Sequence, residues 1–528
     1  MTYTLLSAAE AASSPARDFR QRLGRRPFHH PRKLASMASS DGNSPPTLRS
    51  GQIGTGAIVF MVVAAASPLG AMFVGAGASI GHGNGIGTPG IYVIAGVTLA
   101  LFAVGYVAMS RHVVSAGAFY VYITRGLGRA FGMGAAMIAL ICYNAYVVAL
   151  IAFVGISTQG AASADLGIEL PWQIWSLLAY LVLVTLSYFR IEFSAKVLGV
   201  LLAAEFVILG LLDVMVLVKN GPAAFPLESF TPSSVFTATI GVSIVYAFSS
   251  FTGFEATAIY GEEAREPRRT IPRATYIALA LITGFYVLTT WSLIAAFGAD
   301  GAVQAAQEDS DFVFKANSLY VGGISDHIMH LLVCTSLFAA LLAFHNATAR
   351  YMFALARDGA LPRALARVHQ RHGSPHVASR TQLGFAGAVL VIMALTHLDV
   401  EDIAAGFLGL GALGMLCLQG LASCAVVGFF ARRADRELWR TTVAPTAAAV
   451  LLATGIGLSV WHFPALTGAT SSLMNHLWVL LPVAFAIGLL GAYYMRRAQP
   501  TVYADFGHRD PVPDGDTETA VSTPTTTN

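Results

Sequence analysis

Charged residues are scarce in this chain. They make up 12% of its 528 residues, whereas hydrophobic residues make up 55%. A soluble globular domain is about 25% charged, so this chain has too few polar groups to cover a soluble protein of its size. The mean hydropathy of +0.63 agrees. The composition therefore excludes an ordinary soluble protein and predicts a chain that lies mostly in a bilayer.

Cysteine is also rare, and the four residues are Cys142, Cys334, Cys417 and Cys424. All four lie inside apolar runs without metal-ligand spacing, so we expect packed core thiols rather than disulfides. The net charge of +3 is nearly neutral and gives no reason to expect a nucleic-acid partner. The first 50 residues hold no apolar stretch of signal-peptide length.

Twelve apolar runs are long enough to span a bilayer as helices. They lie at residues 52–81, 88–110, 131–160, 172–189, 197–218, 235–260, 275–297, 327–356, 382–397, 402–430, 442–461 and 474–495. We therefore expect an all-α polytopic membrane protein with twelve transmembrane helices. Both tails, residues 1–50 and 498–528, have polar compositions that predict disorder.

The positive residues predict the orientation of these spans. If the N-terminus is cytoplasmic and the spans alternate, all 32 Lys and Arg except Lys219 and Lys315 fall on the cytoplasmic side. This bias follows the positive-inside rule. The sequence thus predicts a multi-pass protein of the plasma (inner) membrane with both termini cytoplasmic. The amphipathic, Arg-flanked stretch 113–130 is expected to contain a helix along the inner membrane face.

The first apolar run contains a helix-start signal in its middle. Ser67 followed by Pro68 is a favourable N-cap with proline at the first helical position. A helix from Gly54 to Ser67 would rise about 20 Å, which places the break near the middle of the bilayer. A proline kink in a packed helix is one interpretation, and a mid-membrane binding site is the other.

The sixth run is interrupted in a similar way. Gly253 follows the polar pair Ser249 and Ser250, and Thr252 and Glu255 have capping-box spacing. The glutamate could simply cap its own helix, but an ionisable group at this depth by default marks a transport pathway. Interrupted first and sixth helices correspond to each other if the spans form two structural repeats.

Two such breaks would free backbone groups in the middle of the membrane. Free N–H groups at a half-helix start suit a carboxylate, and free carbonyls suit an ammonium group. A ligand with both groups close together is an α-amino acid. The pattern therefore favours a transporter with a small-molecule substrate, either an amino acid or an amine.

Two longer motifs resemble a known family. GFEATAIYGEEAREPRRTIPRA (253–274) is similar to the G-F-E…E-E…P-x-x-x-I-P-x-A signature of the amino acid–polyamine–organocation permeases. The segment 344–378 resembles their eighth helix and the loop after it. The resemblance covers roughly residues 50–430 and implies alternating access.

The resemblance also implies a domain organisation. The expected fold is the LeuT-like five-plus-five inverted repeat. The transport core would occupy residues 51–430, with repeats at about 51–219 and 235–430. Two peripheral helices would follow at residues 431–497.

In relatives, the first-helix break binds the substrate carboxylate and the sixth-helix break helps to hold the amine. The corresponding residues, expected to bind substrate here, are Ala66, Ser67, Pro68, Leu69, Gly70, Ala71, Phe251, Thr252, Gly253 and Phe254. This chain departs from the family's Gly-Ser-Gly motif at the first break, where Pro68 offers no N–H. That departure keeps an amine or polyamine open as the substrate.

Three ionisable groups inside the spans are candidates for proton coupling or gating, namely Glu255, Glu205 and His345. Glu255 matches a glutamate linked to pH sensing or gating in some members of the resembled family. Each group could instead bond to a neighbouring helix. The eighth span has no convincing Ser/Thr pair for sodium, so a proton is the expected coupling ion. Asp213 lies nearer the outer surface and is expected to be solvated.

No nucleophile, zinc or phosphate-binding motif points to an enzyme. His369, His372 and His376 lie among arginines in a predicted cytoplasmic loop, so we expect neither a metal site nor a cofactor. The charged residues at 262–269 form either a solvated loop or ion pairs that close an inner gate. The expected function is proton-coupled, secondary active uptake of an amino acid. An amine or polyamine carrier, or an exchanger, is the alternative, and the oligomeric state stays open.

Overall fold

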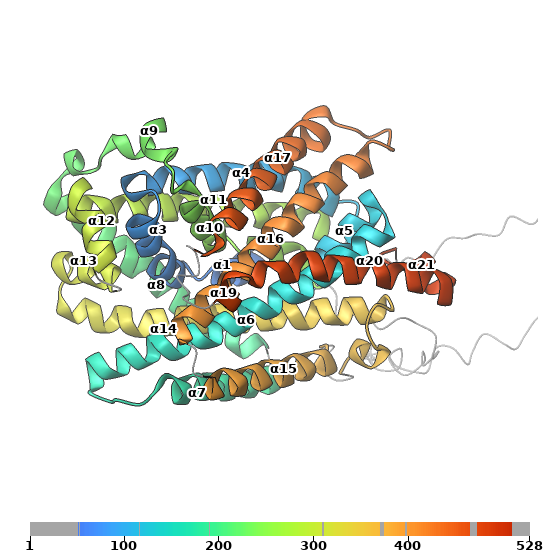
Figure 1. The fold of residues 1–528 in the computed structure, drawn as a ribbon, viewed down its shortest axis with the longest axis horizontal. Helices are drawn as coiled ribbons and strands as arrows, with labels where there is room; N and C mark the ends of the chain where they lie inside the picture. The colour runs from blue at the N-terminus through green and yellow to red at the C-terminus, as the bar shows by residue number, and fades with distance from the viewer. Residues whose placement is uncertain are drawn as a thin grey trace, which may run out of the picture. The chain divides into compact units, whose positions relative to one another are not determined.

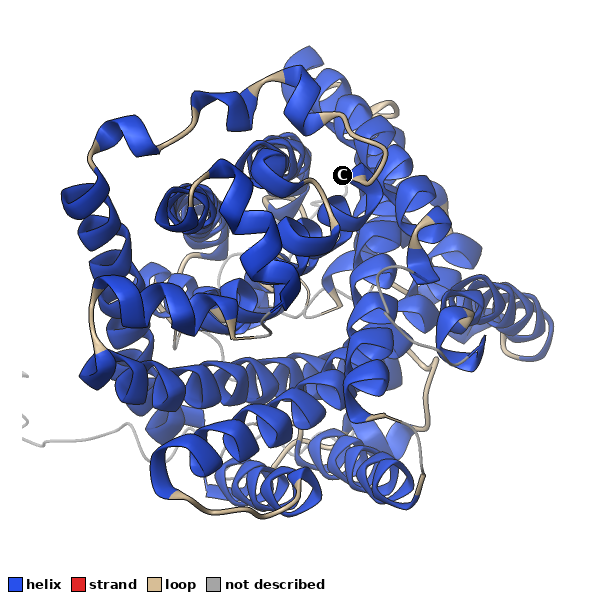
Figure 2. Ribbon diagram, turned by 60° about the vertical axis from the view of Figure 1, so that its left-hand side comes forward, coloured by secondary structure: helices blue, strands red, loops and turns tan. Residues whose placement is uncertain are grey.

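The computed structural model describes residues 51, 53–113, 115, 117–189, 191–308, 311–369, 374–396, 399–464 and 472–508. The N-terminal tail and His372 lie outside this part of the chain. Within it the regular secondary structure is helical, and the β-structure is limited to an isolated bridge between Ile53 and Ala264 (Figure 2).

The N-terminal half contains a broken helix followed by four long helices. The broken helix comprises α1 (Thr55–Ala66), α2 (Pro68–Ala71), the π-helix η1 (Met72–Ala76) and α3 (Gly77–His82). The others are α4 (Thr88–Ser110), α6 (Arg129–Leu166), α7 (Trp172–Phe189) and α8 (Ile191–Asn220). The short helix α5 (Ala118–Leu127) lies between α4 and α6. Helices suit these runs because a bilayer offers no partners for backbone N–H and C=O groups.

The second half repeats this order of elements. Its broken helix comprises α10 (Ile240–Ser250) and the 3-10 helix η5 (Phe254–Glu262). The long helices that follow are α11 (Pro267–Phe297), α14 (Gly323–Arg357), α15 (His376–Leu395) and α16 (Val400–Phe430). The short helices α12 (Ala299–Glu308) and α13 (Phe312–Tyr320) lie where α5 lies in the first half. This shared order supports the predicted pair of repeats.

The remaining elements are peripheral helices and short connectors. The C-terminal ones are η7 (Leu438–Val443), α17 (Ala444–Trp461), α19 (Ser472–Asn475), η8 (Leu477–Val479), α20 (Leu480–Ala498) and α21 (Pro500–Asp505). The connectors are η2 (Gly85–Gly87), η3 (Pro222–Ala224), η4 (Leu227–Phe230), α9 (Pro232–Val235) and η6 (Arg363–Ala366).

Each predicted span coincides with a helical segment. Eleven helices in the described residues are long and apolar enough to cross a membrane, and Trp172–Tyr188 is a shorter apolar helix. The prediction of an all-α, multi-pass membrane protein is therefore confirmed, and the count of twelve holds when α7 is included. In Figure 1, α6 and α14 lie side by side, with α7 and α15 packed along them. The two broken helices contact each other and also α11 and α14.

The stretch 113–130 does contain a helix, but not one on a membrane surface. In α5 the residues Ala118–Thr124 are all buried, and Phe119 and Tyr120 are fully covered. The helix packs against α6 and α16. The prediction of a surface helix is wrong because the amphipathic pattern reflects packing against protein rather than against lipid.

The first part of the C-terminal tail, residues 498–508, is ordered, and residues 509–528 lie outside the described part of the chain. Helix α21 continues the chain beyond residue 498, and Phe506 is fully buried against Tyr120. Gly507 N–H donates to Asp358 at 3.0 Å, and Arg129 donates to Ala504 O at 2.7 Å. Polar composition predicted disorder here, but one aromatic anchor and these hydrogen bonds hold residues 500–508 in place.

The cysteines differ in their surroundings. Cys142 is buried and Cys424 is exposed, while Cys334 and Cys417 are half-buried. The prediction of four packed core thiols is therefore wrong for Cys424. Apolar sequence around a cysteine does not distinguish a face that meets protein from one that meets lipid.

Candidate functional site

The first broken helix turns at a single residue. Ser67 has left-handed backbone angles (φ 49°, ψ 69°), and it lies between the end of α1 and the start of α2 at Pro68. This conformation costs a non-glycine residue roughly 1–3 kcal/mol, so neighbouring contacts must hold it. The predicted break is confirmed, but the predicted cap is wrong because the Ser67 side chain makes no capping hydrogen bond.

The Ser67 hydroxyl instead belongs to a network that reaches α14 and α8. It lies 2.8 Å from Ser336 Oγ, which donates to Glu205 Oε2 at 2.5 Å. Leu69 N–H donates to the same glutamate oxygen at 3.3 Å, and Gly70 N–H donates to Ser336 Oγ at 3.3 Å. The N–H groups freed at the start of α2 are therefore bonded to a carboxylate and a hydroxyl of the protein itself.

The second broken helix turns at Gly253, between the end of α10 at Ser250 and the start of η5 at Phe254. Its backbone angles (φ 117°, ψ −27°) favour glycine. A Cβ at this position would lie 2.9 Å from the Cβ of Ala65. Glycine therefore allows the second break to approach the first closely.

Glu255 is bonded within its own segment. Both carboxylate oxygens accept from Gly253 N–H, at 3.2 and 3.0 Å, and the residue is fully buried. Thr252 does not complete the predicted capping box, since its hydroxyl lies 2.7 Å from Tyr146 Oη and donates to Phe248 O. Glu255 therefore caps its own segment, as one interpretation predicted. It accepts from Gly253 N–H, whereas a capping box would have used Thr252 N–H.

A tyrosine that sequence reasoning missed joins the two breaks. Tyr286 Oη of α11 lies 3.1 Å from Ala66 O and 3.1 Å from Ser250 O, the last carbonyls of α1 and α10. Its ring is buried edge-on against Tyr92 and Phe251. A tyrosine hydroxyl has one proton to donate, so the two carbonyls share it. A lone tyrosine in an apolar run gives no sign of such a contact.

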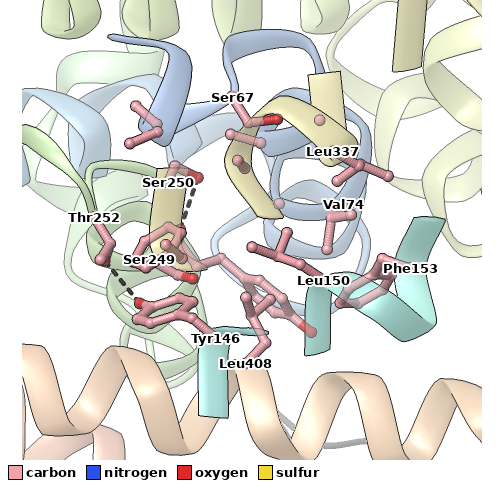
Figure 3. Close-up of a pocket in the computed structure, with 18 residues that line it drawn as sticks. Ser67, Val74, Tyr146, Leu150, Phe153, Ser249, Ser250, Thr252, Leu337 and Leu408 are labelled. Carbon is pink, nitrogen blue, oxygen red and sulfur yellow. Dashed lines mark hydrogen bonds between the residues drawn. The ribbon is translucent and has the colours of Figure 1, made fainter. Parts of the chain in front are cut away.

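A small cavity of about 60 Å³ lies between the two breaks (Figure 3). Hydroxyl groups gather on one side, and apolar side chains on the other. The hydroxyl side shows Tyr146, Ser249, Ser250 and Thr252, and the apolar side shows Val74, Leu150, Phe153 and Leu337. The described residues that line this cavity include no Asp, Glu, Lys, Arg or His. A cavity lined in this way suits a ligand, or a portion of a ligand, that carries no net charge.

Half of the predicted substrate residues line this cavity. They are Ala66, Ser67, Gly70, Ala71 and Thr252. The others shape the breaks without lining the cavity, namely Pro68, Leu69, Phe251, Gly253 and Phe254. Lining residues that sequence reasoning missed come from α6 and α14, such as Tyr146 and Phe344, because only the fold brings those helices to the breaks.

His345 and Asp213 lie away from the cavity. His345 is fully buried between α14 and α15, with Nδ1 against Gln382 Oε1 and Nε2 3.0 Å from Ser379 Oγ. Asp213 is only 3% exposed and accepts from Thr289 at 3.1 Å. The prediction of a solvated Asp213 is therefore wrong, because α11 covers this part of α8.

A larger cavity of about 680 Å³ adjoins the central one, and we call it the vestibule. The two cavities share Val74, Phe153, Tyr246, Ser249 and Leu408. The vestibule extends to the C-terminal end of α6 and the N-terminal ends of α14 and α16. In the orientation predicted from the positive residues, these helix ends would lie outside the cell.

Hydrogen bonds join the chain just before α1 to the chain just after η5. Ile53 N–H donates to Glu263 O at 3.1 Å, and Arg265 N–H donates to Ile53 O at 2.8 Å. Arg350 of α14 donates to both carboxylate oxygens of Glu263, at 2.5 and 3.2 Å, and its guanidinium lies 4.9 Å from the ring centre of Tyr260. The charged segment at 262–269 therefore does form an ion pair with α14, as one of its two interpretations required.

Replacing Arg350 by alanine should loosen this closure. Its side chain is 3% exposed and that of Glu263 is 18% exposed, so removal leaves a largely buried carboxylate without its partner. Breaking such a pair costs about 3–5 kcal/mol. We expect faster hydrogen–deuterium exchange at the amides of Ile53 and Arg265.

Arg269→Ala is the matched control, because its pair with Glu266 is 76% and 73% exposed and such pairs contribute about 0–1 kcal/mol. Equal exchange in the two variants would show that the Arg350 pair does not hold this end closed.

Comparison with known proteins agrees with this architecture. The amino acid permease family model matches residues 57–496. An uncharacterized transporter of Mycobacterium tuberculosis is 31% identical over 182 residues, which are 34% of this chain and 38% of that protein. The branched-chain amino acid permease BcaP of Bacillus subtilis is 24% identical over 62% of this chain and 70% of its own length.

The lysine-specific permease LysP of Lactococcus lactis is 24% identical over 58% of this chain and 63% of its own length. The match to the mycobacterial relative thus covers well under half of that protein, whereas the family model spans most of this chain. With its broken helices and the eleven long apolar helices among its described residues, the chain belongs to the amino acid permease family, whose members are membrane transporters and not enzymes.

Proposed function

We propose that this protein takes up a neutral amino acid across the plasma membrane by alternating access, coupled to protons. The cavity between the two breaks carries the proposal. Its hydroxyl side offers hydrogen bonds to amino and carboxylate groups, and its apolar side offers room for a side chain once the cavity widens. The positive-inside rule supports the proposed cytoplasmic location of both termini.

The apolar side favours an aliphatic substrate. BcaP is named for branched-chain amino acids and LysP for lysine. Val74, Leu150 and Leu337 suit a branched aliphatic side chain. A lysine side chain would need an acidic partner, because burying an unpaired ammonium group is very costly. The described lining of the cavity offers no such partner.

An amine or polyamine carrier is the second candidate. Pro68 has no N–H, and the N–H groups of Leu69 and Gly70 are bonded to Glu205 and Ser336. The first turn of α2 therefore has few donors left for a substrate carboxylate. An amino acid exchanger of the same fold would use the same cavity without net proton movement.

Glu205 is the proposed proton site. Its carboxylate oxygen holds both Leu69 N–H and Ser336 Oγ, and charge-assisted hydrogen bonds are stronger than neutral ones. Protonation of Glu205 would weaken these two hydrogen bonds, which connect α8 to α2 and α14. Because Ser67 and Gly70 bond to Ser336 and line the cavity, this change would reach the substrate and bias the equilibrium between states. Like Glu205, the residues Glu255 and His345 line neither cavity; they are the alternatives because neither of them bonds to the first break.

Uptake into proteoliposomes tests the proposal. With an inward proton gradient we expect accumulation of labelled leucine, but not of lysine or putrescine. Unlabelled isopentylamine, which is leucine without its carboxylate, should compete at least about tenfold more weakly than unlabelled leucine, because the lost hydrogen bonds leave polar groups unpaired. Selective putrescine uptake would favour the amine carrier instead. Leucine movement only against preloaded substrate would make the protein an exchanger.

A further inference from the structure

Three side chains at the rim of the vestibule converge on one point. Asp165 lies at the C-terminal end of α6, and His327 and His330 lie in the first turns of α14. Nδ1 of His327 is 2.6 Å from Asp165 Oδ1, and Nδ1 of His330 is 3.0 and 3.2 Å from the two carboxylate oxygens. One ligand atom from each residue lies within 4.8 Å of the others.

This arrangement has the chemistry of a zinc site. Residues three apart on a helix share a face, so both imidazoles of α14 point the same way. Two histidine nitrogens and one carboxylate oxygen form a donor set that Zn²⁺ accepts at about 2.0–2.2 Å, with a further position left for water. Ligand atoms around such an ion are separated by roughly 3.3 Å. The imidazole nitrogens lie 2.6–3.2 Å from Asp165, and all the ligand atoms lie within 4.8 Å of one another, so adjustment of the side chains would admit the ion.

The surroundings hold the donors in place and leave them accessible. The ring of His330 packs edge-on against Phe314, with the ring centres 4.3 Å apart. The side chains of Asp165 and His330 are 20% and 18% exposed, whereas that of His327 is 63% exposed. An ion could therefore enter from the solvent side and meet two ligands that are already ordered. His330 and Ala164 line the vestibule, so the ion would lie at its mouth.

We infer that Asp165, His327 and His330 form a binding site for Zn²⁺ at the outer end of the vestibule. The site joins α6 to α14 and adds positive charge to the entry route of the substrate. Zn²⁺ binding itself does not depend on the proposed function. The effect on transport does depend on it, because an ion at the mouth of the vestibule would obstruct the entry of the proposed substrate and so raise its KM.

Calorimetric titration of the purified, untagged full-length protein with Zn²⁺ alone tests the site. We expect saturable binding of one ion per chain at this site, and a Kd raised about tenfold or more in His330→Ala and in Asp165→Asn. His112→Ala is the matched control, because His112 forms a pair with Asp435 at 2.9 Å to which the described residues add no third ligand. Its Kd should not change.

Thermal unfolding separates loss of the site from loss of the fold. Zn²⁺ should raise the Tm of the unchanged protein, but not that of a His330→Ala variant whose Tm without metal is normal. Absence of saturable binding would overturn the proposal. It would also be overturned if binding survived His327→Ala/His330→Ala but was lost on replacing His369 and His376. Uptake assays report on the proposed function separately, because there Zn²⁺ should raise KM only while His330 is present.

Discussion

Replacing Glu205 by glutamine will abolish gradient-driven accumulation while substrate exchange survives. Glutamine matches the shape of glutamate and can still accept from Ser336 and Leu69 N–H, but it cannot take up and release a proton. A proton gradient equivalent to 100 mV is worth about 2.3 kcal/mol per proton. That corresponds to about fifty-fold accumulation of substrate. In the variant, the ratio of internal to external leucine should fall to about one.

Asp213→Asn is the matched control for this experiment. Asp213 is a buried carboxylate on the same helix, and it is bonded to Thr289 rather than to either break. We expect this variant to keep its gradient-driven accumulation. Full accumulation by Glu205→Gln would exclude Glu205 as the proton site. Loss of coupling in Glu255→Gln instead would move that role to the second break.

Replacing Gly253 by alanine should lower the initial rate of uptake about tenfold or more. The added Cβ would lie 2.9 Å from the Cβ of Ala65 and 3.1 Å from Ala66 N. The backbone, at φ 117°, would also be strained by roughly 1–3 kcal/mol. Both effects push the second break away from the first, so the cavity between them loses its shape. The measurement is the initial rate of leucine uptake, normalised to the amount of folded protein.

Gly284→Ala in α11 is the control for this substitution. A Cβ there meets no heavy atom within 4 Å, and alanine is favourable inside a helix. Its uptake should match that of the unchanged protein, and both variants should elute as monodisperse species in detergent. Equal uptake by the two variants would show that close contact between the breaks is not required.

Local sequence patterns predicted most of the fold. Each apolar run corresponds to a helix because a spanning segment must satisfy its own backbone hydrogen bonds. The break at Ser67 was predicted from a Ser-Pro helix-start signal, and the break at Gly253 from a glycine within capping-box spacing. In the structure both residues have left-handed backbone angles. Errors arose at α5, at residues 500–508 and at Cys424. In each case composition could not tell whether a side chain faces protein, lipid or solvent.

The candidate site was predicted less completely. Residues next to the breaks were named, and five of them line the cavity. The partners of those residues were not. Tyr286, Ser336 and Tyr146 approach the breaks from helices far away in the sequence, and nothing in their local sequence indicates this. Glu205 was named for its depth in the membrane, whereas its bond to Leu69 N–H appeared only in the structure.

The sequence by itself determined that this chain spans a membrane many times, that its first and sixth helices are interrupted, and that it resembles amino acid permeases. These properties depend on hydrophobicity and backbone preference, which are local. Only the tertiary structure decided which side chains accept hydrogen bonds from the freed N–H groups of the first break. It also decided that Arg350 pairs with Glu263, and that Asp165 contacts two histidines of α14. Those contacts join residues 87 to 165 positions apart. Their formation depends on how the helices pack, and hydrophobic periodicity does not specify that arrangement.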